Sequence, residues 1–212
     1  MSTGPLLDTP TTAAPDASSW FNRDRLRTIG LPVATIGLVA FFAWQSELFL
    51  TARNLRNVGL QAAALAAVSF GQTVVILTAG LDLSVGAVVA LVSVVSALGM
   101  VQFGLPAGIC LGLLAGLAVG LANGLIVTRL RVFPFIATLA MMSVVTGLAL
   151  KISGGTPVAG LPAEFTLVAT TRILGVPLPL VIALVLLVLV LLFLQFTRIG
   201  RNIYAVGGNP QA

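Results

Sequence analysis

The chain of 212 residues contains no histidine, a single cysteine and a single lysine, Lys151. Without histidine and without clustered carboxylates, it lacks both the ligands of a transition-metal site and the groups of a histidine proton relay. We therefore expect no metal, no bound cofactor and no catalytic residue. Cys110 lies inside an apolar run and has no disulfide partner, so it says nothing about the redox compartment.

Charged residues are also scarce. They make up 8% of the chain, whereas hydrophobic residues make up 58% and the mean hydropathy is +1.11. This composition excludes a water-soluble globular protein and predicts an all-α polytopic membrane protein. A helix needs about 20 apolar residues to cross a bilayer. We expect a transmembrane bundle over residues 28–197 with about six spans, at 28–49, 58–79, 83–102, 105–128, 134–150 and 177–197.

Residues 1–27 are rich in Thr, Pro, Ala and Ser, and we expect a disordered tail there rather than a cleaved signal peptide. Basic residues outnumber acidic ones by 11 to 6, but they sit singly or in threes between apolar runs. That placement is typical of loops that orient a membrane protein and does not indicate nucleic-acid binding. A cytoplasmic N-terminus places seven basic residues inside and four outside, although Arg53 and Arg56 oppose this orientation.

Glycine recurs at every fourth position from Gly104 to Gly124. Small residues at this spacing let helix backbones approach closely in a bilayer. The ridge turns by about 200° along the helix, so more than one neighbour can dock on it. We expect helix packing at Gly108, Gly112, Gly116 and Gly120.

A polar stripe runs along the predicted span at 58–79. Gln61 and Gln72 are eleven residues apart, which places them within about 20° of each other on a helix, and Ser69 and Thr73 flank them. The stripe fits either a water-lined substrate path or hydrogen bonds between helices. Four further polar residues are more typical of packing or interhelical hydrogen bonding: Asn123, Thr138, Ser143 and Thr146.

Asp82 is the only charged residue between Val58 and Val101. A carboxylate in hydrocarbon costs about 2.5 to 3.5 kcal/mol even on lenient scales, so the chain must make this position tolerable. In one arrangement Gly80 ends the preceding helix, and Asp82 or Ser84 caps the next. In the other, Asp82 lies deeper, at a break bordered by a polar cavity or another subunit. Both predict a helix break, and Asp82 is a further candidate for the substrate path.

Four segments then occur in order: GLDLSVG at 80–86, PFIATLAMM at 134–142, SGG at 153–155 and TRIGRNIYAVGGN at 197–209. Together they resemble the permease subunits of ribose-type ABC importers, from about residue 50 onward. The resemblance implies a partial ABC importer permease fold in the bacterial inner membrane. It also implies ATP-driven import of a monosaccharide such as ribose or xylose.

The partners that the resemblance implies are a second permease copy, a cytoplasmic ATP-binding subunit, and a periplasmic or lipid-anchored sugar-binding protein, besides membrane lipid. The chain has no phosphate-binding G-x-x-x-x-G-K-[ST] loop, so we expect a partner, not this chain, to hydrolyse ATP. The resemblance places contacts with that ATPase in residues 198–212. The candidates are Arg198, Gly200, Arg201, Tyr204, Gly207, Gly208 and Asn209.

Other functions stay open. The cargo could be another small polar solute, such as an autoinducer, a polyol or a nucleoside. An ion-coupled secondary transporter would also place a carboxylate at a broken helix. Because relatives continue beyond the coupling motif in which this sequence stops, we expect a C-terminally truncated chain, which could be an inactive remnant.

Overall fold

A computed structural model describes residues 17–208, with side chains described from residue 29 onward. The chain divides into two compact units, Met1–Leu55 and Arg56–Ala212. The first unit contains α1 (Ala17–Gln45), so the predicted disordered tail is corrected for residues 17–27, which are helical. They continue without a break into the apolar run, and extending an existing helix costs much less than starting one. The rest of the predicted tail, residues 1–16, lies outside the described residues.

The second unit begins within α2 (Ala52–Leu77) and contains α3 (Val85–Phe103), α4 (Leu105–Thr128), α5 (Pro134–Ser153), α6 (Ala163–Thr170), α7 (Leu178–Phe196) and α8 (Arg198–Gly208). Between α6 and α7, β1 (Arg172–Ile173) pairs antiparallel with β2 (Val176–Pro177). The prediction of an all-α polytopic protein is confirmed, with this hairpin as a small addition. Within residues 17–208, five helices are long and apolar enough to span a membrane, namely α2, α3, α4, α5 and α7. The sixth predicted span corresponds to a shorter apolar helical segment, Ile29–Gln45.

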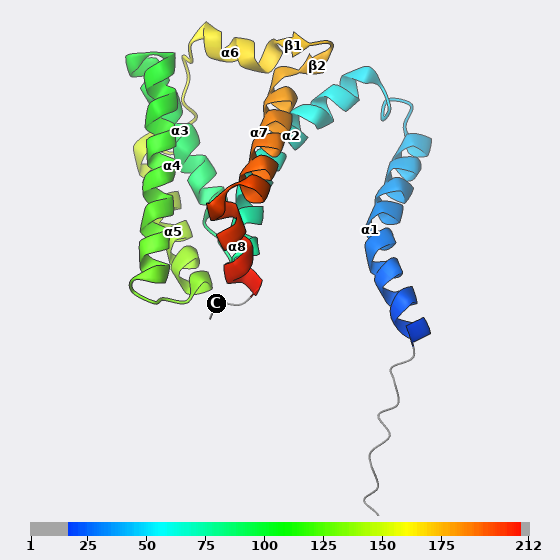
Figure 1. The fold of residues 1–212 in the computed structure, drawn as a ribbon. Coiled ribbons are helices and arrows are strands. Elements are labelled where there is room, and N and C mark those ends of the chain that lie inside the picture. The colour runs from blue at the N-terminus through cyan, green and yellow to red at the C-terminus, as the bar shows by residue number, and fades with distance from the viewer. Residues whose placement is uncertain (1–16, 209–212) are drawn as a thin grey trace, which may run out of the picture. The chain divides into compact units, whose positions relative to one another are not determined.

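Helices α3, α4 and α5 form a three-helix bundle in which α3 packs against both of the others (Figure 1). Its core contains the buried residues Ala87 and Leu91 of α3 and Val145 and Ala149 of α5. Small side chains dominate this core, because close backbone approach replaces hydrophobic drive where the solvent is lipid.

The glycine ridge of α4 explains how closely α3 approaches. A Cβ atom added to Gly108 would lie 2.5 Å from the Met100 amide nitrogen and 2.6 Å from the Ser96 carbonyl oxygen. One added to Gly112 would collide with the Ser96 side chain, and one added to Gly116 would lie 3.2 Å from a Val92 methyl.

Gly120 does not join this contact, because an added Cβ there meets no atom within 4 Å. The prediction that Gly120 takes part in helix packing is therefore wrong for the described residues. Each four-residue step turns the ridge by about 40°, so Gly120 has rotated away from α3.

Helices α7 and α8 meet at a corner made by Thr197. Its hydroxyl donates to the Phe193 carbonyl oxygen at 2.6 Å and accepts a hydrogen bond from the Gly200 amide at 2.9 Å. One side chain thus closes the end of α7 and caps the start of α8. Gly200 is buried in this corner, where an added Cβ would lie 2.5 Å from the Leu194 carbonyl oxygen.

Helix α2 contacts this pair at both of its ends. A Cβ at Gly59 would lie 3.5 Å from a methyl of Leu180 on α7. A Cβ at Gly207 on α8 would collide with the Leu77 carbonyl oxygen and lie 3.0 Å from its carbonyl carbon. The end of α8 therefore rests directly on the end of α2.

Replacing Gly108 with alanine should destabilise the bundle by about 1 to 3 kcal/mol, because the added methyl meets backbone atoms that cannot rotate away. The measurement is the free energy of unfolding in mixed detergent micelles. Gly120→Ala is the matched control on the same helix and should leave stability unchanged or raise it by up to about 1 kcal/mol. Equal effects of the two substitutions would contradict the α3–α4 packing.

Candidate functional site

The chain breaks between α2 and α3, at residues 78–84. At the end of α2 the Gly80 amide donates to the Val75 carbonyl oxygen at 3.2 Å and the Ala79 amide donates to Ile76 at 2.9 Å. These two bonds form a Schellman motif, which requires a left-handed residue just after the helix. Ala79 takes this conformation, with φ of 57°, so the helix reverses at Ala79 and not at Gly80. The predicted break is present, one residue earlier than expected.

Asp82 lies two residues before Ser84, the N-cap residue of α3, and organises the start of this helix. Its Oδ1 atom accepts hydrogen bonds from the Ser84 amide at 2.7 Å and from the Ser84 hydroxyl at 2.6 Å. Ser84 is fully buried at the N-cap position, but its side chain makes no capping bond to the first turn of α3. Ser84 is therefore not a capping side chain, and the Asp82 carboxylate fixes Ser84 just before the positive end of the α3 dipole.

Side chains from three other parts of the bundle hold the break. The Gln72 amide of α2 donates to the Asp82 carbonyl oxygen at 3.2 Å, and the Asn123 amide of α4 donates to the Ser84 hydroxyl at 2.9 Å. The Thr138 hydroxyl of α5 accepts a hydrogen bond from the Leu83 amide at 3.2 Å. We call Gln72, Asp82, Ser84, Asn123 and Thr138 the break cluster.

The Thr138 hydroxyl also has one proton to donate. It lies 2.9 Å from the Pro134 carbonyl oxygen and 3.3 Å from that of Leu81, so the proton serves one of them at a time. Thr138 can therefore bond the break from both sides of Asp82, through Leu81 and Leu83.

The break cluster lies inside the bundle, not at its edge. Asn123 is five residues before the end of α4, and Thr138 is four residues after the start of α5. At about 1.5 Å of rise per residue, both are about 6 to 8 Å from those helix ends. Both predicted arrangements share the helix break, which is present, and protein groups satisfy the irregular backbone about one turn inside the neighbouring helix ends.

Two buried oxygen atoms of the cluster have no hydrogen-bond partner among the described residues: Oε1 of Gln72 and Oδ1 of Asn123. An unsatisfied buried acceptor costs about 1 to 3 kcal/mol. The cluster therefore contains two buried acceptors that the described arrangement leaves unpaired.

The predicted polar stripe of α2 divides into two parts. Gln72 belongs to the break cluster, whereas Gln61, Ser69 and Thr73 are exposed. Ser69 donates to the Leu65 carbonyl oxygen and Thr73 to that of Ser69, both within α2. The stripe is therefore not gathered into one polar site within this chain.

Asn123 and Thr138 form the interhelical hydrogen bonds that the sequence predicts for them, and both bonds go to the break. Ser143 and Thr146 bond only carbonyl oxygens of their own helix. The sequence carried no signal for this difference, because Thr146 lies as close to one end of the predicted span at 134–150 as Thr138 does to the other.

The predicted coupling residues lie on α8. Arg198, Arg201 and Tyr204 are exposed, Gly200 is buried at the corner, and Gly207 lies against α2. Gly208 is exposed with open space around it. Gly207 and Gly208 are the last two residues of α8, and Asn209 lies outside the described residues.

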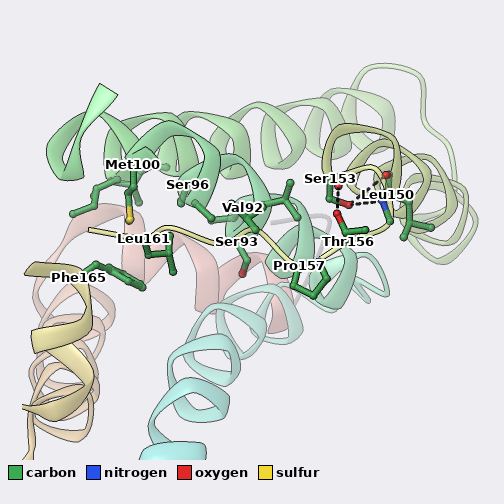
Figure 2. Close-up of a pocket in the computed structure, with 16 residues that line it drawn as sticks. Val92, Ser93, Ser96, Met100, Leu150, Ser153, Thr156, Pro157, Leu161 and Phe165 are labelled. Carbon is green, nitrogen blue, oxygen red and sulfur yellow. Dashed lines mark hydrogen bonds between the residues drawn. The ribbon is translucent and has the colours of Figure 1, made fainter. Parts of the chain in front are cut away.

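A groove of about 790 Å³ lies elsewhere, between α3, the outer ends of α4 and α5, residues 155–161 and α6 (Figure 2). Most of its lining is apolar, including Met100, Leu161 and Phe165, and hydroxyl groups come from Ser93, Ser96, Ser153 and Thr156. None of the residues predicted for a substrate path lines this groove. Among residues 17–208, no three His, Cys, Asp or Glu side chains gather as a metal site would require.

Comparison with known proteins shows which family this chain belongs to. Residues 54–212 match the family described as branched-chain amino acid transport system / permease component. The chain belongs to this permease family. The predicted resemblance is thereby confirmed, and the chain is an integral membrane protein of the permease type.

The permease is 43% identical to the ribose import permease protein RbsC of Bacillus subtilis, over 77% of this chain and 52% of that protein. It is 35% identical to RbsC of Escherichia coli K12, over 85% of this chain and 58% of the relative. It is also 35% identical to the D-allose transport system permease protein AlsC of that organism, over 81% of this chain and 54% of AlsC. The chain spans about half the length of these curated relatives. No solved structure matches it.

Thr138→Val should destabilise the permease by about 1 to 3 kcal/mol, because the isosteric change leaves the Leu83 amide without its acceptor. Unfolding in mixed micelles measures the loss. Thr146→Val is the matched control, since Thr146 lies on the same helix, is exposed and bonds only the Met142 carbonyl oxygen. It should change stability by less than about 0.5 kcal/mol. If the two variants proved equally stable, Thr138 would not hold the break.

Proposed function

We propose that this chain forms part of the transmembrane permease subunit of an ATP-driven importer, which carries a monosaccharide across the bacterial inner membrane. The observation that carries this proposal is the match of residues 54–212 to a permease family, together with 43% identity to a ribose import permease. The partners are those of such importers: a second permease copy, an ATP-binding subunit in the cytoplasm and an extracytoplasmic sugar-binding protein.

The cargo is a neutral sugar of the ribose or allose kind. Relatives named for ribose and for D-allose support this class, and a galactose/methyl galactoside import permease is 32% identical. The chemistry of the chain agrees with a neutral, hydroxyl-rich cargo. Asp82 is the only charged residue between Val58 and Val101, so this part of the chain offers little fixed charge to a charged cargo.

The sugar passes between two permease copies, along the face of α2 that carries Gln61, Ser69 and Thr73. These side chains are exposed in the single chain, so a second copy can approach them. Their hydroxyl and amide groups would bind a sugar weakly, which suits a passage, while the sugar-binding protein supplies the affinity for capture. No bound cofactor is assigned to this chain.

Energy enters through α8. Its exposed residues Arg198, Arg201 and Tyr204 offer a surface to the ATP-binding subunit, while Gly207 rests on the last carbonyl group of α2. A displacement of α8 by the ATPase therefore pushes directly on the end of α2, next to the break. The unsatisfied acceptors of Gln72 and Asn123 raise the energy of the described arrangement, so a modest force is enough to favour another one.

Uptake of labelled ribose and allose in a Bacillus subtilis strain without its own ribose permease tests this function. We expect a chimera that joins this chain to the remaining C-terminal part of the Bacillus subtilis ribose permease to restore ribose uptake with the resident ATP-binding and sugar-binding proteins. Uptake should stop when ATP is depleted and persist when a proton ionophore is added at constant ATP. Uptake that collapses with the ionophore alone would indicate an ion-coupled transporter, and no uptake from a correctly inserted chimera would contradict the proposed function.

Two neighbouring glycines provide matched variants for the same assay. Gly207→Ala should lower the uptake rate at unchanged protein level, because the methyl collides with the Leu77 carbonyl oxygen and shifts α8 against α2. Gly208→Ala adds the same methyl where nothing lies within 4 Å and should transport at the parent rate. Equal rates for the two variants would contradict force transfer at this contact.

A further inference from the structure

The hairpin between α6 and α7 ends in an unusual tip. Ile173 pairs with Val176, so the loop consists of Leu174 and Gly175 alone. Both loop residues have positive φ, 52° for Leu174 and 83° for Gly175, as a type I′ turn requires. Asn-Gly is the sequence that suits such a turn, whereas leucine is disfavoured in the left-handed region. Leu174 is thus a poor choice for the turn itself.

Leu174 is also a poor choice for contact with water. Its side chain is 100% exposed, and its neighbour Ile173 is 47% exposed. Leu174 therefore makes no packing contact within the hairpin that would offset the cost of its left-handed backbone.

The hairpin lies directly before α7, and the length of that helix indicates where the hairpin lies relative to the bilayer. The 19 residues of α7 are about 28 Å long, close to the thickness of the hydrocarbon core, so Leu178 lies at the edge of that core. Leu174 is only four residues away, and the headgroup layer on each side is about 5 to 8 Å deep. Figure 1 shows the hairpin projecting sideways from the end of α7, and contacts with α7 hold both strands in place.

The flanking residues fit a phospholipid surface. Ile182, Leu184 and Val185 of α7 are exposed and apolar, and the exposed side chains of Ile173 and Leu174 lie just before this helix in the chain. Arg172 is exposed in β1 and forms no ion pair with any described residue. Arginine beside apolar residues is typical of an anchor in which the guanidinium binds lipid phosphate.

We propose that the hairpin tip, Leu174 with Ile173 and Arg172, is a membrane anchor that inserts into the boundary between headgroups and acyl chains. The Leu174 side chain contacts the acyl chains of the phospholipid, and the Arg172 guanidinium binds at the level of the phosphates. By fixing the start of α7 at the membrane surface, it sets the depth of the helix that leads into α8. The inference does not depend on which solute the permease carries.

Tryptophan fluorescence in phosphatidylcholine vesicles tests the anchor. Trp20 and Trp44 are first replaced by phenylalanine, and Leu174→Trp then provides a single reporter. Vesicles with brominated acyl chains should quench this reporter as strongly as Leu184→Trp on the lipid-facing side of α7, and aqueous iodide should quench it weakly. Strong quenching by iodide with none by brominated lipid would overturn the proposal and indicate a tip that faces water or a partner protein.

A second pair of variants separates the anchor from the turn. Ile173→Trp serves as the reporter. Leu174→Asn replaces the Leu-Gly loop by Asn-Gly, which suits the type I′ turn better, and removes the apolar side chain. Quenching of this reporter by brominated lipid should fall in Leu174→Asn and persist in Leu174→Met. Unchanged quenching in Leu174→Asn would show that Leu174 does not hold the hairpin in the membrane.

Discussion

Inside a bilayer every backbone amide and carbonyl group needs a partner from the protein, and this permease breaks its backbone between two apolar spans. The seven residues between α2 and α3 lie about one helical turn inside the bundle. Gln72 donates to the Asp82 carbonyl oxygen, and Thr138 and the Asp82 carboxylate accept from the Leu83 and Ser84 amides, so side chains replace bonds that a helix would supply. Asn123 adds a bond to the Ser84 hydroxyl. These bonds fix where α2 stops, how α3 starts and how the two are placed against α4 and α5.

Close packing makes this polar arrangement possible. The Gly108 and Gly112 contacts bring α4 against α3, and that approach puts the Asn123 amide within 2.9 Å of Ser84. On the other side of the break, Gly207 brings α8 onto the last carbonyl group of α2. Glycine therefore permits close backbone approach at two places, between α3 and α4 and between α8 and the end of α2. The two unsatisfied acceptors at the break lie between these regions and lower the cost of leaving the described arrangement.

Much of this fold could be predicted from the sequence. Long apolar runs determine the spans, and a lone carboxylate between two of them predicts the break, because both follow from the cost of polar groups in lipid. The partners of the break could not be predicted, since Asn123 and Thr138 are 39 and 55 residues from the groups they bond. Local rules also failed where tertiary contacts prevail: Ala79 takes the left-handed position beside an available glycine, Gly120 turns away from α3, and Gly207 and Gly208 continue a helix. The hairpin at Leu174 has no sequence signal, because its tip residue opposes the turn that it forms.

The most direct test of the central claim is a double-mutant cycle between Ser84 and Asn123, which are in contact across the break. Unfolding free energies in mixed micelles are measured for Ser84→Ala, Asn123→Leu and the double variant. If buried polar side chains hold the break, the two positions should couple by about 0.5 to 2 kcal/mol, the range found for hydrogen bonds between membrane helices. Effects that add to within about 0.3 kcal/mol would show that the two residues act independently, and the account of a break held by its polar neighbours would be wrong.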